Sequence, residues 1–148
     1  MSYLNLLMLK GRVLGIDYGE KRIGLAITDP DRTMVFPREM LKVALEKEVL
    51  EVLKKYCFDN QISLIVLGVP YLLSMQKTAF SEKILKFGKE LSQVTSLDIE
   101  YVDESLSSFE ACEKMENFEK EKKHKSSGVK DVLSAQVILE RWMRNGAV

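Results

Sequence analysis

The sequence predicts a single α/β domain on a five-stranded mixed sheet, with an antiparallel meander first, parallel strands after it, and helices on its faces. Three observations support this fold class. Hydrophobic residues make up 46% of the 148 positions, which is enough for one core. Residues 12–40 contain three β-rich segments separated by short turns. From residue 46 onward, one-sided helices alternate with short apolar strands.

The first half of the chain predicts the meander. Residues 12–18 (RVLGIDY) and 23–28 (IGLAIT) are β-branched and apolar, and the intervening GEKR indicates a turn, so we expect a hairpin. A third strand is predicted over 33–40, after a turn at Asp31. Pro37 places this strand at an edge or at a strand end, because proline has no N–H to donate to a sheet.

The second half predicts the crossovers. Apolar residues at helical spacing indicate a helix over 46–57, and 64–67 (LIVL) is short and apolar on both faces, as a central buried strand is. The elements predicted after it are a helix over 78–94, a strand over 97–102, a helix beginning near Ser107 with capping-box spacing to Glu110, a charge-dense loop within 113–128, and a last helix over about 129–144. We expect residues 1–148 to form one domain, with 1–9 as a short extension.

Composition excludes several classes of protein. The 22 Lys and Arg residues balance the 22 Asp and Glu residues, so a nucleic-acid partner would have to be held by a local basic patch or by metal ions. Two distant cysteines and a single histidine indicate neither a zinc site nor a disulfide framework, and predict reduced thiols in a cytoplasmic protein. The apolar start is too short to span a bilayer, so no membrane partner is expected.

Asp17 is the first candidate site residue. It lies in an otherwise apolar strand, where an unpaired buried carboxylate costs several kcal/mol or shifts its pKa. The functional interpretation is a metal ligand at the open end of a sheet, and the alternative is an Asp that caps the turn at Gly19. We favour the metal ligand, because Gly15 and Gly19 on either side allow backbone or phosphate to approach closely.

Two further carboxylates are expected at the same edge of the sheet. Glu104 follows the last strand, where open α/β folds usually place ligand sites. Asp131 is predicted in the first turn of the last helix, in line with the apolar stripe of Ala135, Ile138 and Trp142. For both acids the alternative role is stabilisation of a helix dipole. Asp103 beside Glu104 is a candidate helix cap.

Together, Asp17, Glu104 and Asp131 predict a site of hard oxygen ligands, for which Mg²⁺ or Mn²⁺ is the natural occupant. Gly19, Lys21 and Arg22 lie beside Asp17, where they would receive anionic oxygens. The chemistry that this set indicates is metal-assisted attack on a phosphodiester.

A lysine-rich segment precedes Asp131. It is either a solvated flexible loop or a basic arm that contacts a nucleic-acid backbone, and Lys130 at its end is the candidate phosphate ligand. His124 in this segment is interpreted as a surface residue without a catalytic role.

Four segments resemble, in order, the signature blocks of the YqgF family: GIDYGEKRIGLAITD (15–29), IVLGVP (65–70), VDESLSSFEA (102–111) and VKDVLSAQVILERW (129–142). That family is described as Holliday junction resolvases and pre-16S ribosomal RNA nucleases with an RNase H-like fold. The resemblance implies this fold and an acidic triad at Asp17, Glu104 and Asp131, in agreement with the site argued from the residues. Ser105 stands where the family usually has Arg, and YLLSMQKTA (71–79) lacks the family's glycine-containing loop.

The expected function is that of a divalent-metal nuclease that acts on structured RNA and processes the 5′ end of pre-16S rRNA in ribosome biogenesis, with two metal ions held by the triad. One alternative is resolution of four-way DNA junctions, which needs two paired cuts and hence a homodimer instead of a monomer. A phosphotransferase of the actin and sugar-kinase type is disfavoured, because those proteins close two such domains over ATP. A non-catalytic ribosome-assembly module is the third alternative, which Ser105 keeps open.

Overall fold

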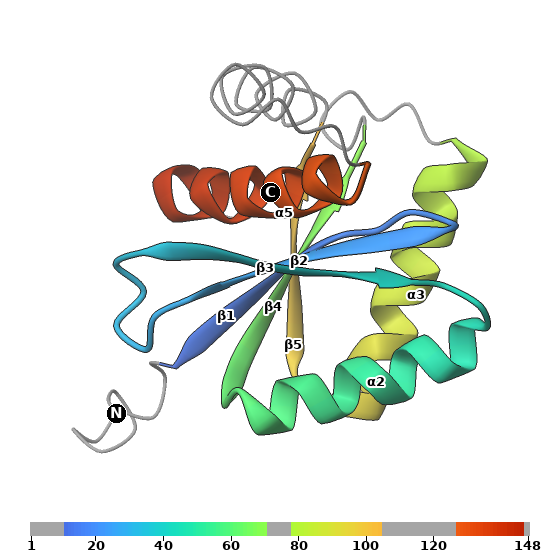
Figure 1. The fold of residues 1–148 in the computed structure, drawn as a ribbon, viewed down its shortest axis with the longest axis horizontal. Coiled ribbons are helices and arrows are strands. Elements are labelled where there is room, and N and C mark those ends of the chain that lie inside the picture. Colours follow the sequence, from blue (N-terminus) through green and yellow to red (C-terminus); the bar gives the residue numbers. More distant parts are fainter. Residues whose placement is uncertain (1–10, 71–77, 105–126, 147–148) are drawn as a thin grey trace.

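A computed structural model describes residues 11–70, 78–104 and 127–146 (Figure 1). Its five strands form one mixed sheet in the order β3-β2-β1-β4-β5, which confirms the predicted fold class. The strands are β1 (Arg12–Asp17), β2 (Arg22–Thr28), β3 (Val35–Lys42), β4 (Ile62–Val69) and β5 (Asp98–Asp103). The helices are α2 (Glu46–Asp59), α3 (Ala79–Thr95) and α5 (Ser127–Asn145). The extension at 1–9, the helix near Ser107 and the loop within 113–128 lie outside the described residues.

Strand pairing brings three strand ends to one edge of the sheet. β1 is antiparallel to β2, with Asp17 opposite Gly24, and parallel to β4, with Ile16 opposite Leu67. β4 is in turn parallel to β5. The carboxyl ends of β1, β4 and β5 therefore lie side by side, which is where open α/β sheets usually hold ligands.

β3 is an edge strand, as Pro37 predicted. Pro37 pairs with Ala26 of β2 next to a shift in register, and no strand of the described sheet lies on the other side of β3. The third strand runs to Lys42, two residues beyond the predicted end at Met40, and this extension carries Lys42 to the carboxyl edge of β1.

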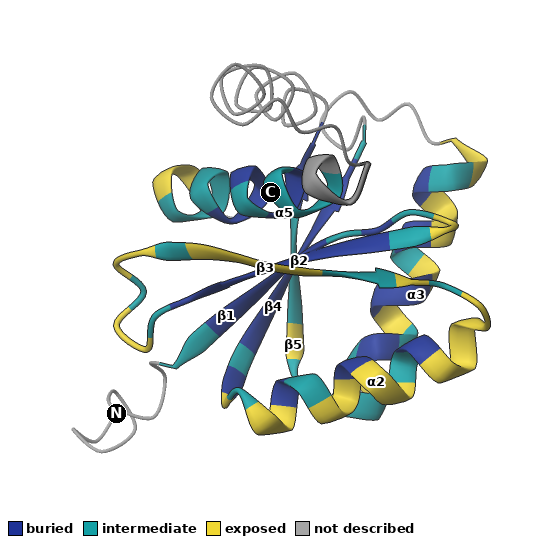
Figure 2. Ribbon diagram, in the orientation of Figure 1, coloured by how far each residue is buried: buried dark blue, intermediate teal, exposed yellow. Residues whose placement is uncertain are grey.

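Helices cover both faces of the sheet (Figure 1). α2 and α3 pack on one face, where Leu53, Phe87 and Leu91 are fully buried against β1, β2 and β4. α5 packs on the other face through Ala135 and Ile138. The central strands are the most deeply buried and β3 is largely exposed (Figure 2), so the core confirms the prediction that the LIVL segment is a central strand.

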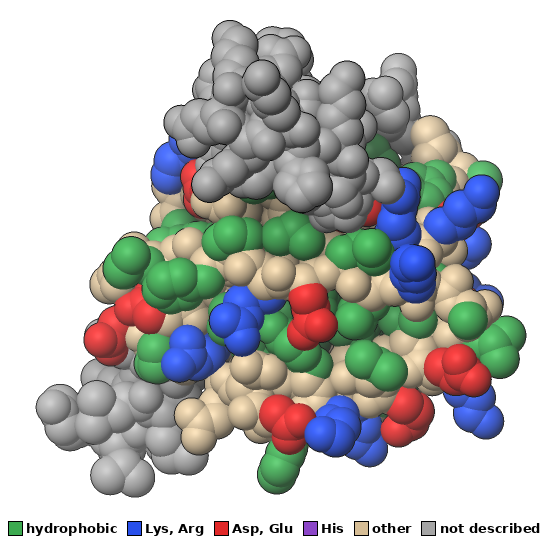
Figure 3. All heavy atoms as spheres, viewed as in Figure 1, with side chains coloured by type: hydrophobic (Ala, Val, Ile, Leu, Met, Phe, Trp, Pro, Cys, Tyr) green, Lys and Arg blue, Asp and Glu red, His purple; other side chains and the backbone are tan. Residues whose placement is uncertain are grey.

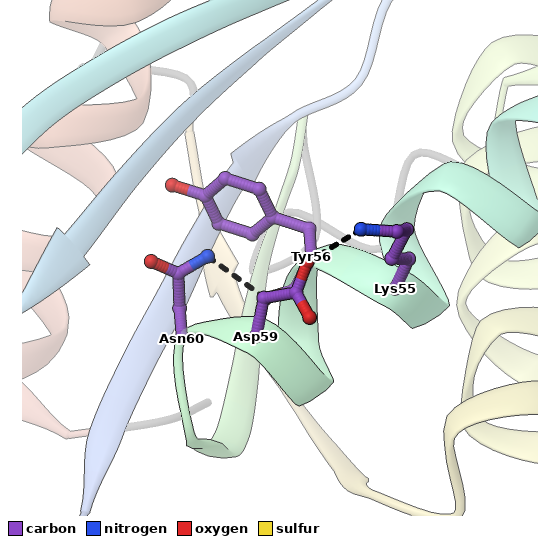
Figure 4. A network of polar contacts seen from close by, with 4 residues as sticks. All are labelled: Lys55, Tyr56, Asp59 and Asn60. Atoms are coloured by element: carbon purple, nitrogen blue, oxygen red, sulfur yellow. Dashed lines mark hydrogen bonds and ion pairs between the residues drawn. The ribbon is translucent and has the colours of Figure 1, made fainter.

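Local polar contacts set the start of α3 and the end of α2. α3 begins with a capping box in which Thr78 and Ser81 exchange side-chain-to-backbone hydrogen bonds. At the end of α2, Lys55 pairs with Asp59 at 2.9 Å, and the Asn60 amide donates to the Tyr56 carbonyl at 2.9 Å (Figure 4). These contacts end α2 where the chain turns into β4.

The visible surface carries no extended block of one charge over the described residues. Acidic and basic side chains are interspersed over α2 and its surroundings (Figure 3), as the balanced composition predicted. No helix in the described part of the chain is long and apolar enough to cross a membrane.

Candidate active site

Three glycines let α5 lie directly on the backbone of the sheet. A Cβ atom at Gly15 of β1 would overlap Leu139, one at Gly24 of β2 would overlap the Asp131 backbone, and one at Gly68 of β4 would lie 2.5 Å from Ile138 Cδ1. Side chains at these positions would push the helix away from the sheet. The close approach therefore depends on glycine in three neighbouring strands.

This approach places Asp131 next to Asp17. Gly24, which lies under the Asp131 backbone, is the register partner of Asp17. α5 begins at Ser127, so Asp131 lies in its second turn, and the prediction of the first turn was wrong. The prediction used apolar periodicity, which starts at Val129 because the two preceding helical residues, serine and glycine, carry no large apolar side chain.

The carboxylate of Asp131 is turned toward Arg22. Its Oδ2 atom lies 3.3 Å from Arg22 Nε, and the two side chains are 21% and 40% exposed. The alternative role of Asp131, stabilisation of the helix dipole, requires a place in the first turn and is therefore weakened.

Asp17 and Glu104 form a direct pair. Asp17 ends β1 and shares the α5 face with Gly15, because alternate residues of a strand face the same side. Glu104 follows β5, and its backbone N–H donates to the Val69 carbonyl at 3.1 Å. Its side chain reaches across β4 to hydrogen-bond the Asp17 carboxylate.

Burial and the neighbouring charge make Glu104 a proton carrier. Glu104 is only 8% exposed. This burial, and secondarily the charge of Asp17, raises the pKa of Glu104 from 4.5 to about 9, and Asp103 adds to the effect. Glu104 therefore holds a proton at neutral pH and donates it in the hydrogen bond to Asp17. The sequence analysis expected the buried carboxylate to be Asp17, but Asp17 is half-buried at the strand end and Glu104 is the buried one.

The donor set suits a hard divalent cation, although the side chains are not arranged as a closed metal cage. Carboxylate oxygens are the ligands that Mg²⁺ and Mn²⁺ prefer. Within the described ranges, no group of three or more Asp, Glu, His or Cys residues is placed to hold an ion. Two of the predicted ligands, Asp17 and Glu104, touch each other, and the third, Asp131, is adjacent but pairs with Arg22.

The predicted phosphate ligands have different surroundings. Gly19 lies in the β1–β2 turn, where a Cβ atom would be 2.5 Å from the Arg22 carbonyl oxygen, so the turn itself requires glycine. The Lys21 side chain is exposed, and its backbone carbonyl accepts from Val43 N–H at 2.9 Å. Arg22 is engaged with Asp131. Lys130 lies within α5, and its side chain is outside the described residues.

Lys42 is a cation of the site that the sequence analysis missed. It is the register partner of Arg22 and is exposed. Its neighbour Leu41 packs against the core under α2, so the Lys42 side chain lies on the α5 face beside Arg22. The prediction ended this strand at residue 40, and the signal that extends it is the alternation of apolar Leu41, charged Lys42 and apolar Val43.

α5 also holds the end of β5. Arg141 Nη1 donates to the Asp103 carbonyl at 2.7 Å, and the Trp142 indole donates to Glu100 Oε1 at 3.0 Å. The helix that Asp103 was expected to cap lies outside the described residues. These bonds fix the strand immediately before Glu104, and so the helix that carries Asp131 also positions the segment that carries Glu104.

The chain is similar to one family over nearly its whole length. The family model described as "RuvX: Holliday junction resolvase" matches residues 11–145. Proteins named "Putative pre-16S rRNA nuclease" from Endomicrobium trichonymphae and Maridesulfovibrio salexigens are each 32% identical, and the matches cover 89% of this chain and 94% and 97% of theirs. The protein of that name from Dictyoglomus thermophilum is 32% identical over 139 residues.

The fold is similar to that of solved RuvC structures. Thermus thermophilus RuvC in complex with a Holliday junction substrate superimposes with a TM-score of 0.60 at 11% identity, covering 93% of this chain and 98% of that one. A second structure of Thermus thermophilus RuvC has a TM-score of 0.52 at 14% identity. These likenesses confirm the RNase H-like fold that the sequence blocks implied.

Proposed function

The chain belongs to the RuvX family of Holliday junction resolvases, and on that basis we propose that it is a divalent-metal nuclease whose substrate is structured RNA, cut at the 5′ end of pre-16S rRNA. The observation that carries the proposal is the buried Glu104 carboxyl beside the half-buried Asp17 at the carboxyl edge of the sheet. Burial of Glu104 next to a second carboxyl group destabilises the fold when no cation is present, so the placement of Glu104 is better explained by chemistry than by stability.

Asp17, Glu104 and Asp131 are the residues that would hold Mg²⁺ or Mn²⁺, in a site for two ions. When bound, these ions activate the attacking water and stabilise the leaving 3′ oxygen. A bound cation would favour the ionised form of Glu104. Asp131 would exchange its contact with Arg22 for the cation, and the Arg22 guanidinium would then be available to a substrate phosphate.

Lys21 and Lys42 lie beside Arg22, at the start of β2 and the end of β3. We call Lys21, Arg22 and Lys42 the cationic flank. Gly19 keeps the turn between Asp17 and Arg22 tight, so that the flank stays close to the acids. Lys130 lies within α5 and remains a candidate phosphate ligand on the sequence alone. A local patch of this kind compensates for a net charge of zero in binding a polyanion.

The names of the relatives favour RNA, and the family description favours branched DNA as the second candidate substrate. Three relatives at 32% identity are named for pre-16S rRNA cleavage. The matching family model is described by junction resolution, and one fold neighbour was solved on a Holliday junction. Junction resolution requires two symmetric cuts and therefore a dimer of this chain.

The test is cleavage of a pre-16S RNA fragment and of a four-way DNA junction by the wild type, Asp17→Asn and the control Asp59→Asn, in Mg²⁺, Mn²⁺ and EDTA. Asp59 is an exposed acid at the end of α2 that pairs with Lys55. We expect metal-dependent RNA cuts that Asp17→Asn loses and Asp59→Asn retains. Junction cleavage without RNA cleavage would establish the second candidate, and no cleavage of either substrate would favour the non-catalytic assembly module.

A further inference from the structure

Strand β4 lies between the two strands that carry Asp17 and Glu104. Asp17 ends β1 and Glu104 follows β5, but the strand order places β4 between them. Neighbouring strands are spaced by about 4.8 Å, so β1 and β5 are separated by roughly 10 Å. A β4 side chain on the α5 face at this level would stand between the two carboxyl groups.

The residue at that place is Gly68. It lies one position beyond the Ile16–Leu67 pair, level with Asp17, and opposite Val102 of β5. Val66, two residues earlier, packs on the α5 face, so the missing side chain of Gly68 is on that face too. A Cβ atom there would lie 2.9 Å from Glu104 Oε2 and 2.5 Å from Ile138 Cδ1.

We propose that Gly68 is a positioning residue of the active site, because its bare backbone is the passage through which the Glu104 side chain crosses β4 to reach Asp17. The inference rests on the proposed function for its catalytic consequence, whereas its geometric consequence is independent of that function. Any side chain at position 68 displaces the Glu104 carboxyl from Asp17 and so breaks up the ligand set.

A competing explanation is that Gly68 serves only helix packing, as Gly15 does. The nearest atom to a Cβ at Gly68 belongs to Ile138 of α5, and a Cβ at Gly15 would meet Leu139 of the same helix. Gly15→Ala therefore presses on α5 without touching Glu104. Gly68→Ala combined with Ile138→Val removes the Cδ1 overlap while keeping the overlap with Glu104.

The experiment compares the wild type, Ile138→Val, Gly68→Ala/Ile138→Val and Gly15→Ala by three measurements. These are the crystal structure without metal, the rise in Tm caused by Mn²⁺ without nucleic acid, and kcat with KM for the cleaved substrate. In Gly68→Ala/Ile138→Val we expect a folded protein in which Glu104 no longer bonds Asp17. We also expect about tenfold weaker Mn²⁺ binding and about a hundredfold lower kcat with little change in KM.

Two outcomes would overturn the inference. One is a structure of Gly68→Ala/Ile138→Val in which Glu104 still bonds Asp17 and Mn²⁺ raises Tm as in Ile138→Val. The other is loss of the Asp17–Glu104 bond in the crystal structure of Gly15→Ala as well, which would assign that loss to displacement of α5. Loss of the Asp17–Glu104 bond in a protein whose wild type cleaves nothing would support the inference and overturn the proposed function alone.

Discussion

Asp17 and Glu104 act as a unit, because each sets the protonation or the environment of the other. Asp17 is the second-largest cause, after burial, of the raised pKa of Glu104, and the proton on Glu104 is donated toward Asp17. A carboxyl that is protonated without metal and ionised with it makes cation binding pH-dependent, because binding must release the proton. At the residue scale, the pair therefore links stability and activity to pH.

Glu104→Gln should make the metal-free protein less sensitive to pH. Because folding raises the Glu104 pKa from 4.5 to about 9, its proton stabilises the folded state fully below pH 4.5, and this contribution is lost as pH rises toward about 9. We expect the Tm of the wild type in EDTA to fall more steeply between about pH 5 and about pH 9 than that of Glu104→Gln.

Thermal unfolding in EDTA across this pH range checks this expectation, with Glu51→Gln as the control because Glu51 is an exposed acid on α2. Equal slopes for the wild type and Glu104→Gln would show that Glu104 does not carry the proton.

Glu104→Asp should be nearly as inactive as Glu104→Gln, even though it keeps the carboxylate. The glutamate side chain spans β4 to reach Asp17, and aspartate is shorter by one methylene group. We expect kcat in Mg²⁺ to fall by about a hundredfold, the cost of a misplacement of about 1 Å. Activity within a few-fold of the wild type would mean that the crossing does not need the full side-chain length.

Cys57 should be inert in the folded protein. Cys57 is 4% exposed, and burial raises the pKa of its thiol to about 12, so the reactive thiolate is scarce at neutral pH. In a Cys112→Ser variant, which leaves one cysteine, we expect labelling by a thiol reagent only as fast as the protein unfolds. Rapid labelling at low denaturant would indicate that α2 opens locally.

At the scale of elements, the start of β2 and the end of β3 would form the substrate-facing side of the proposed site. Arg22 and Lys42 are opposite each other in the two strands, and Lys21 precedes Arg22 in the turn. The antiparallel half of the sheet thus supplies cations beside Asp17, while the parallel half brings Glu104 and α5 brings Asp131. The proposed site therefore needs residues from both halves of the sheet and from α5.

Lys42→Ala should weaken substrate binding more than it slows the chemical step. Loss of one phosphate contact is expected to raise KM and to reduce the slope of log affinity against log salt by about 0.7 to 0.9. Binding of the nucleic acid at several salt concentrations, in the Asp17→Asn background to prevent cleavage, measures this slope. Lys55→Ala on α2 is the matched control, and an equal effect of both variants would argue against a specific contact.

At the scale of the whole molecule, one small domain carries all the acids and cations of the proposed site. The matching family model spans residues 11–145, and the relatives are covered over 94% or more of their length. On the proposed function we expect RNA cleavage to need one copy of the chain, whereas paired cuts in a junction need two.

The RNA cleavage rate per protein molecule should not depend on protein concentration. Light scattering first gives the dissociation constant of any dimer. Single-turnover cleavage is then measured at protein concentrations below and above that constant. A rate that rises with the dimer fraction would indicate that a second copy takes part, and would move the proposed substrate toward the four-way junction.

Hydropathy patterns were sufficient to predict the five strands, the three described helices and the edge position of β3, because apolar periodicity and proline report local burial. The helix expected near Ser107 lies outside the described residues and stays a prediction. The acids themselves were also found from sequence, since Asp17 interrupts an apolar strand and Glu104 follows another. The family blocks then pointed to the same three acids. The RNase H-like fold that those blocks implied is confirmed, and the roles of the individual site residues stay predictions.

Contacts between distant segments were beyond the reach of these patterns. The passage of Glu104 over Gly68, the ion pair of Arg22 with Asp131, and the place of Lys42 beside Arg22 all join residues from different elements. Periodicity indicates which face of a helix or strand is buried, but it does not indicate which other segment packs against that face. The glycines on the sheet carry no hydropathy signal, and yet they set how closely α5 approaches and where its carboxylate lies, so the site was defined only once packing had brought these segments together.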